Sequence, residues 1–286
     1  MKTVAILFHE AREDPAGSTI HHLAEFWREA GIEVIYLFGT KRFVPADLVI
    51  VHVNLSVVPP YYLEFADRYP IALNRQITDI RKSTFSTQTL EPGDRWTGPV
   101  LVKSDLNFGG VPEKSIGRSW IERHWEPAKR FRAAMERRIP TRHPFARQSD
   151  YRLFSSLSMV PREWFKAKDV IVEKFTPEIE NDLYYLRMYQ VLGDRWTCTR
   201  VGSPEPLVKA HNSVIAADVE PHPVVEDWRR KLGLDYGKLD YVVVDGSPIL
   251  LDVNKTTGSS PGYREANELS ERRRHLAEGL KYYFSN

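Results

Sequence analysis

The sequence has a single cysteine, Cys198, among its 286 residues, and its charges nearly cancel, with 40 Lys and Arg against 38 Asp and Glu. One thiol can form neither an internal disulfide nor a cysteine-rich zinc site, so a disulfide scaffold is excluded and a reducing, cytoplasmic setting is expected. A net charge of +2 argues against a general nucleic-acid binder, which needs a clear basic excess. No run approaches the roughly 18 apolar residues of a membrane span. We therefore expect neither nucleic acid nor membrane as a partner.

The composition is otherwise that of a globular protein with a sizeable core, since hydrophobic residues make up 42% and charged residues 27%. In the first 80 residues, short β-rich runs at 3–8, 33–38, 48–53 and 71–73 alternate with a helical pattern after Ser18. This alternation predicts a parallel sheet covered by helices. Ligands of such sheets bind at the carboxyl ends of the strands. Those ends carry His9, Glu10, Asn54, Asn74 and Arg75.

The pattern of predicted strands and helices changes after about residue 80. Further strands are predicted at 100–103, 170–175, 183–191 and 196–201, an amphipathic helix ends at Gly233, and a final helix covers 264–284. Residues 118–148 are basic and aromatic. They are read as a solvated helix with some buried aromatics, with a nucleic-acid face as the less favoured alternative.

The most informative feature is a predicted hairpin, 239–244 and 249–254, around Asp245-Gly246. A three-residue loop would pair Val244 with Pro248 and place Asp240 opposite Asp252, with Asn254 on the same face. Two adjacent carboxylates and an amide would suit Mg²⁺. A two-residue loop would instead put the two acids on opposite faces. The alternative is that both are separate surface or capping acids.

Two weaker features accompany the hairpin. Lys103 ends an apolar strand and precedes a loop that closes on Gly109-Gly110, where backbone N–H groups could approach phosphate, although an ordinary turn explains the loop as well. The run Val170-Ile-Val-Glu-Lys-Phe175 is a strand whose edge could face an adenine ring.

The ordered set PVLVKSDLNFGG, DVIVEKF and GKLDYVVVDGSPILLDVNKTTG resembles the ATP-grasp superfamily, which includes D-alanine–D-alanine ligase and glutathione synthetase. The resemblance covers roughly residues 75–265. It implies an α/β (α+β) ATP-grasp fold in residues 81–286, with a lid subdomain at 98–172 and a C-terminal catalytic subdomain at 173–286. Residues 1–80 would form a small Rossmann-like domain that precedes it. The sequence departs from the family where Asp252 replaces a frequent Glu and Lys255-Thr256-Thr257-Gly258 replaces a Pro-containing turn.

The resemblance also implies roles for individual residues. Lys82, Lys103, Ser104, Gly109 and Gly110 would hold the phosphates of ATP, Glu173, Lys174 and Phe175 would contact adenine, and Asp240, Asp252 and Asn254 would bind Mg²⁺. Arg187 and Lys238 would face the triphosphate or the developing anion. From their strand-end positions, His9, Asn74 and Arg75 are substrate candidates, and for Arg75 a structural ion pair is an equal alternative.

The implied function is an ATP- and Mg²⁺-dependent ligase that joins a small-molecule carboxylate to an amine or a similar nucleophile through an acyl phosphate. A small-molecule kinase and a non-catalytic nucleotide-binding module are the alternatives. Cys198 is expected to be a core residue rather than a nucleophile, and the sequence leaves open whether the protein is a homodimer.

Overall fold

The computed structural model describes residues 1–12, 14–115, 151–209, 211–258 and 266–284. The chain forms two compact units. The larger unit combines Met1–Ile80 with Pro177–Asn286, and the smaller unit is Arg81–Thr176. The division drawn from the sequence differs, because it groups residues 173–286 with 81–172.

The larger unit begins with a parallel sheet of four strands in the order β2-β1-β3-β4. Its strands are β1 (Thr3–Phe8), β2 (Glu33–Phe38), β3 (Leu48–His52) and β4 (Ala72–Leu73), and its helices are α1 (Thr19–Glu29) and α2 (Pro60–Ala66). Every residue of β3 is buried, which is the pattern of a strand covered on both faces. Ser18 precedes α1 as predicted, but its hydroxyl donates to the carbonyl of Pro15 rather than capping the helix.

Alternate residues of β1 enter two different cores. Val4, Ile6 and Phe8 pack with α1, whereas Ala5 and Leu7 pack with α2. The first of these cores also contains Leu192, Tyr236, Leu276 and Leu280 from the C-terminal part of the chain. In addition, the indole N–H of Trp27 donates to the carbonyl of Ala277 at 2.8 Å. This shared core explains why the two ends of the sequence fold as one unit.

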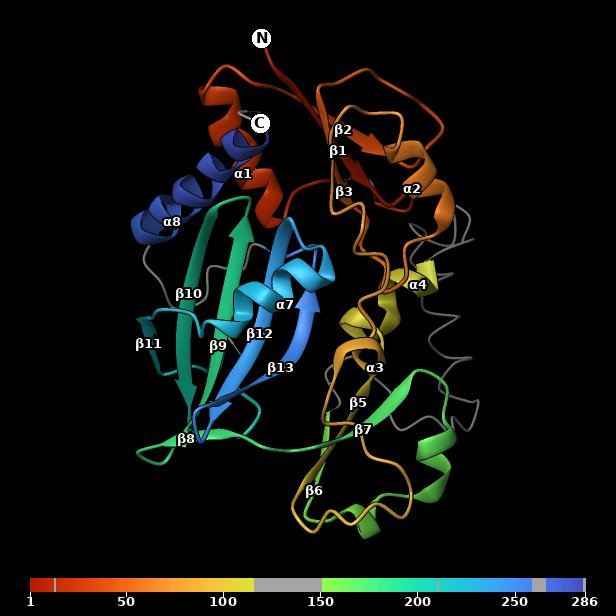
Figure 1. The fold of residues 1–286 in the computed structure, drawn as a ribbon, viewed down its shortest axis with the longest axis vertical. Helices are drawn as coiled ribbons and strands as arrows, with labels where there is room; N and C mark the ends of the chain where they lie inside the picture. The colour runs from red at the N-terminus through yellow and green to blue at the C-terminus, as the bar shows by residue number, and fades with distance from the viewer. Residues whose placement is uncertain (13, 116–150, 210, 259–265, 285–286) are drawn as a thin grey trace, which may run out of the picture. The chain divides into compact units, whose positions relative to one another are not determined.

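The C-terminal part of the larger unit is an antiparallel sheet in the order β11-β10-β9-β12-β13, with β8 on β9 (Figure 1). Its strands are β8 (Glu178–Glu180), β9 (Leu183–Leu192), β10 (Arg195–Ser203), β11 (Ile215–Asp218), β12 (Tyr236–Val244) and β13 (Ser247–Asn254). Its helices are α7 (Val224–Leu232), α8 (Ala266–Glu278) and the 3₁₀ helix η4 (Gly279–Phe284). Gly233 ends α7 in the left-handed conformation, with φ of 66°, as its position predicts.

The smaller unit contains an antiparallel sheet in the order β6-β5-β7. Its elements are α3 (Lys82–Phe85), β5 (Val100–Ser104), η1 (Asn107–Gly110), α4 (Val111–Ser115), β6 (Arg152–Phe154), η2 (Leu157–Met159), η3 (Arg162–Lys166) and β7 (Val170–Lys174). Val100, Val102 and Val172 form its core with Leu90, Leu157 and Val160. The basic segment 118–148 lies outside the described residues.

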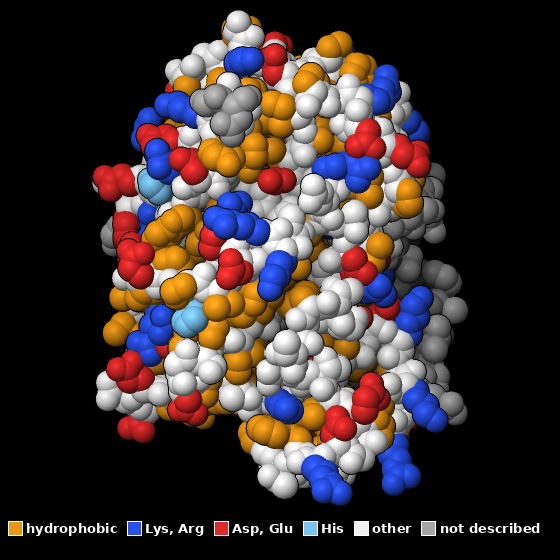
Figure 2. Space-filling model, viewed as in Figure 1, with side chains coloured by type: hydrophobic (Ala, Val, Ile, Leu, Met, Phe, Trp, Pro, Cys, Tyr) orange, Lys and Arg blue, Asp and Glu red, His pale blue; other side chains and the backbone are white. Residues whose placement is uncertain are grey.

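On the face of the molecule drawn in Figure 2, basic and acidic side chains are interspersed. Among the described helices, none combines the length and the apolar character that crossing a bilayer requires.

Candidate functional site

The β12–β13 hairpin brings Asp240 and Asp252 directly opposite each other. Its turn has two residues rather than the predicted three, because Val244 pairs with Ser247. Asp245 and Gly246 both have positive φ, 50° and 76°, as a type I′ turn requires. The predicted loop was therefore wrong. A bulge at Leu251 restores the facing pair, since Tyr241 pairs with Leu250 and Asp240 pairs with Asp252.

One face of this hairpin gathers four polar side chains. Lys238 and Asp240 are two apart on β12, and they lie opposite Asn254 and Asp252 respectively, so all four share a face. The ammonium of Lys238 lies 2.8 Å from Oδ2 of Asp240. The other oxygen of Asp240, Oδ1, is buried and accepts no hydrogen bond within the described part of the chain.

Burial raises the pKa of Asp240, and the charge of Asp252 raises it further, against the opposing effect of Lys238. Burial by itself would lower the pKa of Lys238, but the charge and hydrogen bond of Asp240 together with the charge of Asp252 outweigh burial, and the pKa is raised. Both shifts report two carboxylates crowded around one ammonium. A second cation would relieve the remaining repulsion.

These residues fit a magnesium ion. Two carboxylates and an amide provide only oxygen ligands, and Mg²⁺ in proteins typically takes one or two carboxylates beside its other ligands. The buried oxygen of Asp240 supports this assignment, because a buried polar atom normally has a partner. Among the described residues, no group of three or more His, Cys, Asp and Glu could hold a metal ion, so the hairpin site would depend on the amide of Asn254 as well as its two carboxylates.

Arg187, predicted to act beside Lys238, lies on the opposite face of the sheet. It pairs with Tyr241, whose ring contacts Trp228 of α7 with centroids 6.2 Å apart. Its guanidinium donates to both oxygens of Glu178 at 2.9–3.3 Å. The structure therefore separates Arg187 from the hairpin face.

Glu178 is the centre of that second cluster. Besides Arg187, it accepts from Arg200 at 2.7 Å and from the backbone N–H of Val243 at 2.8 Å. Burial alone would raise its pKa, but these hydrogen bonds and charges outweigh burial and lower it. The cluster links β8, β9, β10 and β12 and so helps to hold these strands together.

In the smaller unit, the structure joins two residues that the sequence assigned to different parts of a nucleotide. Nζ of Lys103 lies 2.6 Å from Oε2 of Glu173, and both side chains are only 4% exposed. Glu173 on β7 pairs with Leu101, and Lys103 on β5 pairs with Ile171, so adjacent strands hold the two groups together. The ion pair orients the lysine ammonium within the sheet.

Lys82 begins α3 and is also buried, with Nζ donating to the carbonyl of Leu106 at 3.2 Å. The loop after β5 is anchored to the same helix, because the N–H and hydroxyl of Ser83 both donate to Asp105 at 2.8 Å. These hydrogen bonds connect Lys82 and Ser83 of α3 to the loop from Ser104 to Gly110, here called the glycine loop.

The glycine loop contains three consecutive residues in the left-handed backbone conformation. Phe108, Gly109 and Gly110 all have positive φ, of 49°, 59° and 71°. Phe108 is 64% exposed, and Ser104 accepts from the N–H of Leu106 at 3.2 Å. Successive backbone N–H groups in such a turn can form an anion-binding concavity, which suits the predicted phosphate contact.

At the end of the predicted adenine strand, the N–H groups of Lys174 and Phe175 are both used within the smaller unit. The N–H of Lys174 donates to Gln88 and that of Phe175 to Pro99, each at 2.9 Å. Lys174 and Phe175 can therefore offer a ligand their carbonyl oxygens rather than their N–H groups.

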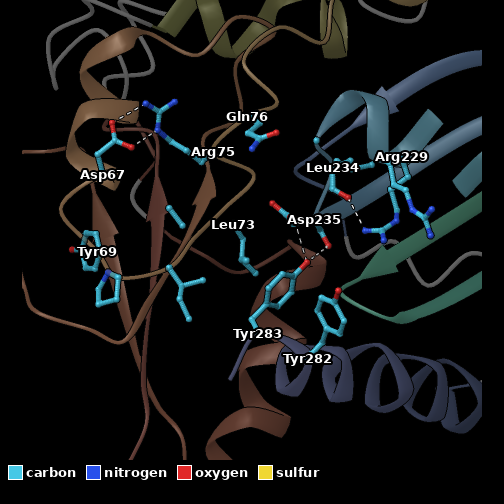
Figure 3. Close-up of a pocket in the computed structure, with 15 residues that line it drawn as sticks. Asp67, Tyr69, Leu73, Arg75, Gln76, Arg229, Leu234, Asp235, Tyr282 and Tyr283 are labelled. Atoms are coloured by element: carbon cyan, nitrogen blue, oxygen red, sulfur yellow. Dashed lines mark hydrogen bonds and ion pairs between the residues drawn. The ribbon is translucent and has the colours of Figure 1, made fainter. Parts of the chain in front are cut away.

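Asn74 and Arg75, predicted as substrate residues, have other contacts. The fully buried side chain of Asn74 donates to the carbonyl of Tyr236 and accepts from the N–H groups of Asp235 and Tyr236, at 2.8–3.0 Å. Arg75 forms a bidentate ion pair with Asp67. Figure 3 shows this pair at the edge of a cavity of about 640 Å³, with Tyr282 and Tyr283 on its other side. The side chain of Asn74 is thus bonded to backbone groups, and Arg75 forms the ion pair that was the alternative to a substrate contact.

His9, the third substrate candidate, is buried at the end of β1 and accepts from the N–H of Ala11 at 3.1 Å. Three nearby residues were not predicted: His52, Lys255 and Thr256. His52 is buried, and the charges of Arg12 and Lys255 act on it. Only their positions in the sequence could have indicated these residues: His52 ends a buried strand, and Lys255 and Thr256 directly follow Asn254. Residues 259–265, which hold Ser259, Ser260 and Gly262, lie outside the described residues.

The fold is similar to that of D-alanine–D-alanine ligase from Bacillus anthracis complexed with ATP, with a TM-score of 0.52, 11% identity, and coverage of 100% of this chain and 97% of that chain. A second structure of that ligase gives a TM-score of 0.50 and 12% identity, over 100% and 96%. A RimK domain ATP-grasp protein from Sphaerobacter thermophilus aligns over 99% and 98%, with a TM-score of 0.49 and 12% identity. No protein-family model and no curated protein matches the sequence. The chain has the ATP-grasp fold, as its motifs predict.

Proposed function

We propose that this ATP-grasp protein is an ATP- and Mg²⁺-dependent ligase that joins a carboxylate to an amine, or to a similar nucleophile, through an acyl phosphate. The observation that carries the proposal is the shared face of Lys238, Asp240, Asp252 and Asn254 on one hairpin. Facing carboxylates beside a lysine are suited to a substrate that brings both phosphate oxygens and a divalent cation.

In this proposal Asp240, Asp252 and Asn254 hold Mg²⁺, which supplies neutralising charge to the phosphates when bound. Lys238 lies 2.8 Å from Asp240, and it provides a fixed positive charge beside the cation ligands. In this proposal Arg187 supports the sheet through its ion pair with Glu178 and is assigned no step of the reaction.

Lys82, Lys103 and the loop from Ser104 to Gly110 are assigned to the phosphates, and the carbonyl groups of Lys174 and Phe175 to the adenine. The buried Glu173 keeps the ammonium of Lys103 in one orientation. Oriented cations of this kind are effective in a site that excludes water.

We propose the following reaction for these groups. A carboxylate oxygen of the substrate attacks the γ-phosphorus, the bond from that phosphorus to the β,γ-bridging oxygen breaks, and ADP leaves. The amine then attacks the acyl carbon, loses a proton, and displaces inorganic phosphate. We assign this chemistry to small-molecule acids and amines in the cytoplasm.

The test is ADP release in the presence of Mg²⁺, with pooled small acids and pooled amines added separately and together. We expect release that needs both pools and a joined product in the mass spectrum. Asp252→Ala and Lys103→Ala should abolish turnover, whereas Asp227→Ala, an exposed position on α7, should not. A phosphorylated acid as the stable product would indicate a kinase. Nucleotide binding with no ADP formed from any pool would indicate a binding module.

A further inference from the structure

Thr256 links the hairpin face to the end of β3. Its backbone N–H donates to Oδ1 of Asn254 at 2.8 Å. Its hydroxyl lies 2.9 Å from Oδ1 of Asn54 and 3.4 Å from Oδ1 of Asn254. Asn54 and Thr256 are 202 residues apart in the sequence but belong to the same compact unit.

The hydroxyl of Thr256 has one proton and cannot donate to both asparagines. The shorter distance assigns this proton to Asn54, because a contact of 3.4 Å is at the long end of hydrogen-bond geometry. Oδ1 of Asn254 has two lone pairs, of which the N–H of Thr256 takes one. The second lone pair is then available to a ligand.

The position of Asn54 is set by its neighbours. Val53 and Leu55 are buried, at 0% and 2% exposure, and the N–H of Leu55 donates to the carbonyl of Val53 at 2.9 Å. This tight turn closes around Asn54 and directs its side chain out of the core toward Thr256. The parallel sheet therefore supplies the acceptor that the hairpin needs.

We propose that Asn54 is a positioning residue for the cation site, and that it acts through Thr256 by drawing the Thr256 hydroxyl proton away from Asn254. The inference rests on the proposed function, since it takes Asn254 as a cation ligand. When Asn54 is removed, the hydroxyl turns to Oδ1 of Asn254 and occupies the lone pair that the cation needs. Replacing Thr256 by the isosteric valine removes the hydroxyl and keeps the N–H.

The test measures Mn²⁺ binding from the loss of the free-ion signal in electron paramagnetic resonance, in the wild-type chain, Asn54→Ala, Thr256→Val and the double variant. Removing a group that orients a metal ligand typically lowers affinity by about 10- to 100-fold. We expect roughly a tenfold loss in Asn54→Ala. Thr256→Val and the double variant should both bind within about twofold of wild type, because the lone pair stays open.

The double variant separates positioning from a structural role. If Asn54 only stabilises the loop, the double variant binds as weakly as Asn54→Ala, and the inference is overturned. Unfolding of each variant, followed by circular dichroism, shows whether Asn54→Ala is folded at the temperature of the titration; if it is not, Asn54→Ser is used in both backgrounds.

Asp252→Ala tests the underlying proposal independently. If wild type does not bind Mn²⁺, or if Asp252→Ala binds equally well, the cation site itself fails and the inference fails with it. A different outcome is that Asp252→Ala loses Mn²⁺ binding and the Asn54→Ala/Thr256→Val double variant binds as weakly as Asn54→Ala. That outcome keeps the cation site and rejects only the role of Asn54.

Discussion

Asp240 faces Asp252 across the β12–β13 hairpin even though the turn has two residues, because Leu251 is the extra residue of a bulge. Without the bulge, a two-residue turn would pair Asp240 with Leu251 and put Asp252 on the other face. Bulges reorient side chains in this way next to functional sites. The candidate cation site therefore depends on one extra residue in β13.

The opposite faces of the sheet predict different effects for two basic residues. Lys238→Met should lower the rate of ADP release by about 100-fold, as expected for the loss of a charge that stabilises the transition state. Arg187→Gln should reduce stability through Glu178 but leave the rate of the folded enzyme within about threefold. Both rates are normalised to the folded fraction measured by urea unfolding. A comparable loss of rate in the two variants would contradict the placement of Arg187 away from the chemistry.

The buried pair Lys103–Glu173 makes a prediction about stability. Glu173→Gln leaves the buried ammonium short of a compensating charge, so the free energy of unfolding should fall by about 3 kcal/mol. The double variant Lys103→Met/Glu173→Leu should recover most of that loss, because apolar side chains of similar volume need no compensation. Urea unfolding measures both. The double variant should still fail to bind nucleotide, and normal nucleotide affinity there would remove Lys103 from the phosphate contacts.

Asn74 should behave as a structural residue. Asn74→Ala leaves three buried backbone groups of Asp235 and Tyr236 without their partner, which should lower the free energy of unfolding by about 3 kcal/mol. Asn74→Gly keeps the positive φ of 57° accessible and isolates the hydrogen-bond contribution from backbone strain. A raised KM without loss of stability would instead return Asn74 to the substrate site.

His52 should make the protein sensitive to mild acid. Burial, helped by the positive charges of Arg12 and Lys255, lowers its pKa from 6.5 to about 3. The unfolded chain takes up a proton below about pH 6.5 and the folded chain does not, so stability is complete above that pH and declines as the pH falls toward 3. At pH 5.5 the contribution of His52 should be a loss of about 1.4 kcal/mol.

The measurement compares urea unfolding at pH 7.5 and pH 5.5 in wild type, His52→Gln and His22→Gln. His52→Gln should lose less stability between the two pH values than wild type. His22, whose side chain is 31% exposed on α1, serves as the control and should follow wild type. Equal losses of stability in all three proteins would show that the pKa of His52 does not differ between the folded and the unfolded chain.

Several elements could be predicted because their signals are local. The strands of the parallel sheet, the helix end at Gly233 and the two strands of the hairpin follow from apolar periodicity and turn residues. The motif order also predicted the ATP-grasp fold. The final helix was predicted as continuous to residue 284, but it becomes a 3₁₀ helix after Glu278.

The fate of the polar residues could not be predicted in the same way. Arg187 and Lys238 have similar chemistry and both lie in β-strands, and only the pairing of β9 with β12 shows that they are on different faces. Asn74 and Asn54 both follow short parallel strands. The side chain of Asn74 is hydrogen-bonded to backbone groups of residues 235 and 236, whereas that of Asn54 accepts a hydrogen bond from Thr256.

By itself, the sequence determined which segments form strands and helices, which fold they make, and that the hairpin carries two carboxylates and an amide. Those properties depend on residues close together in the chain. The tertiary structure decided that Asp240 meets Asp252 through a bulge, that Lys103 meets Glu173, and that Asn54 reaches Thr256. Each of these contacts depends on strand register or on packing between distant segments, and a change of one residue in register exchanges the two faces of a strand.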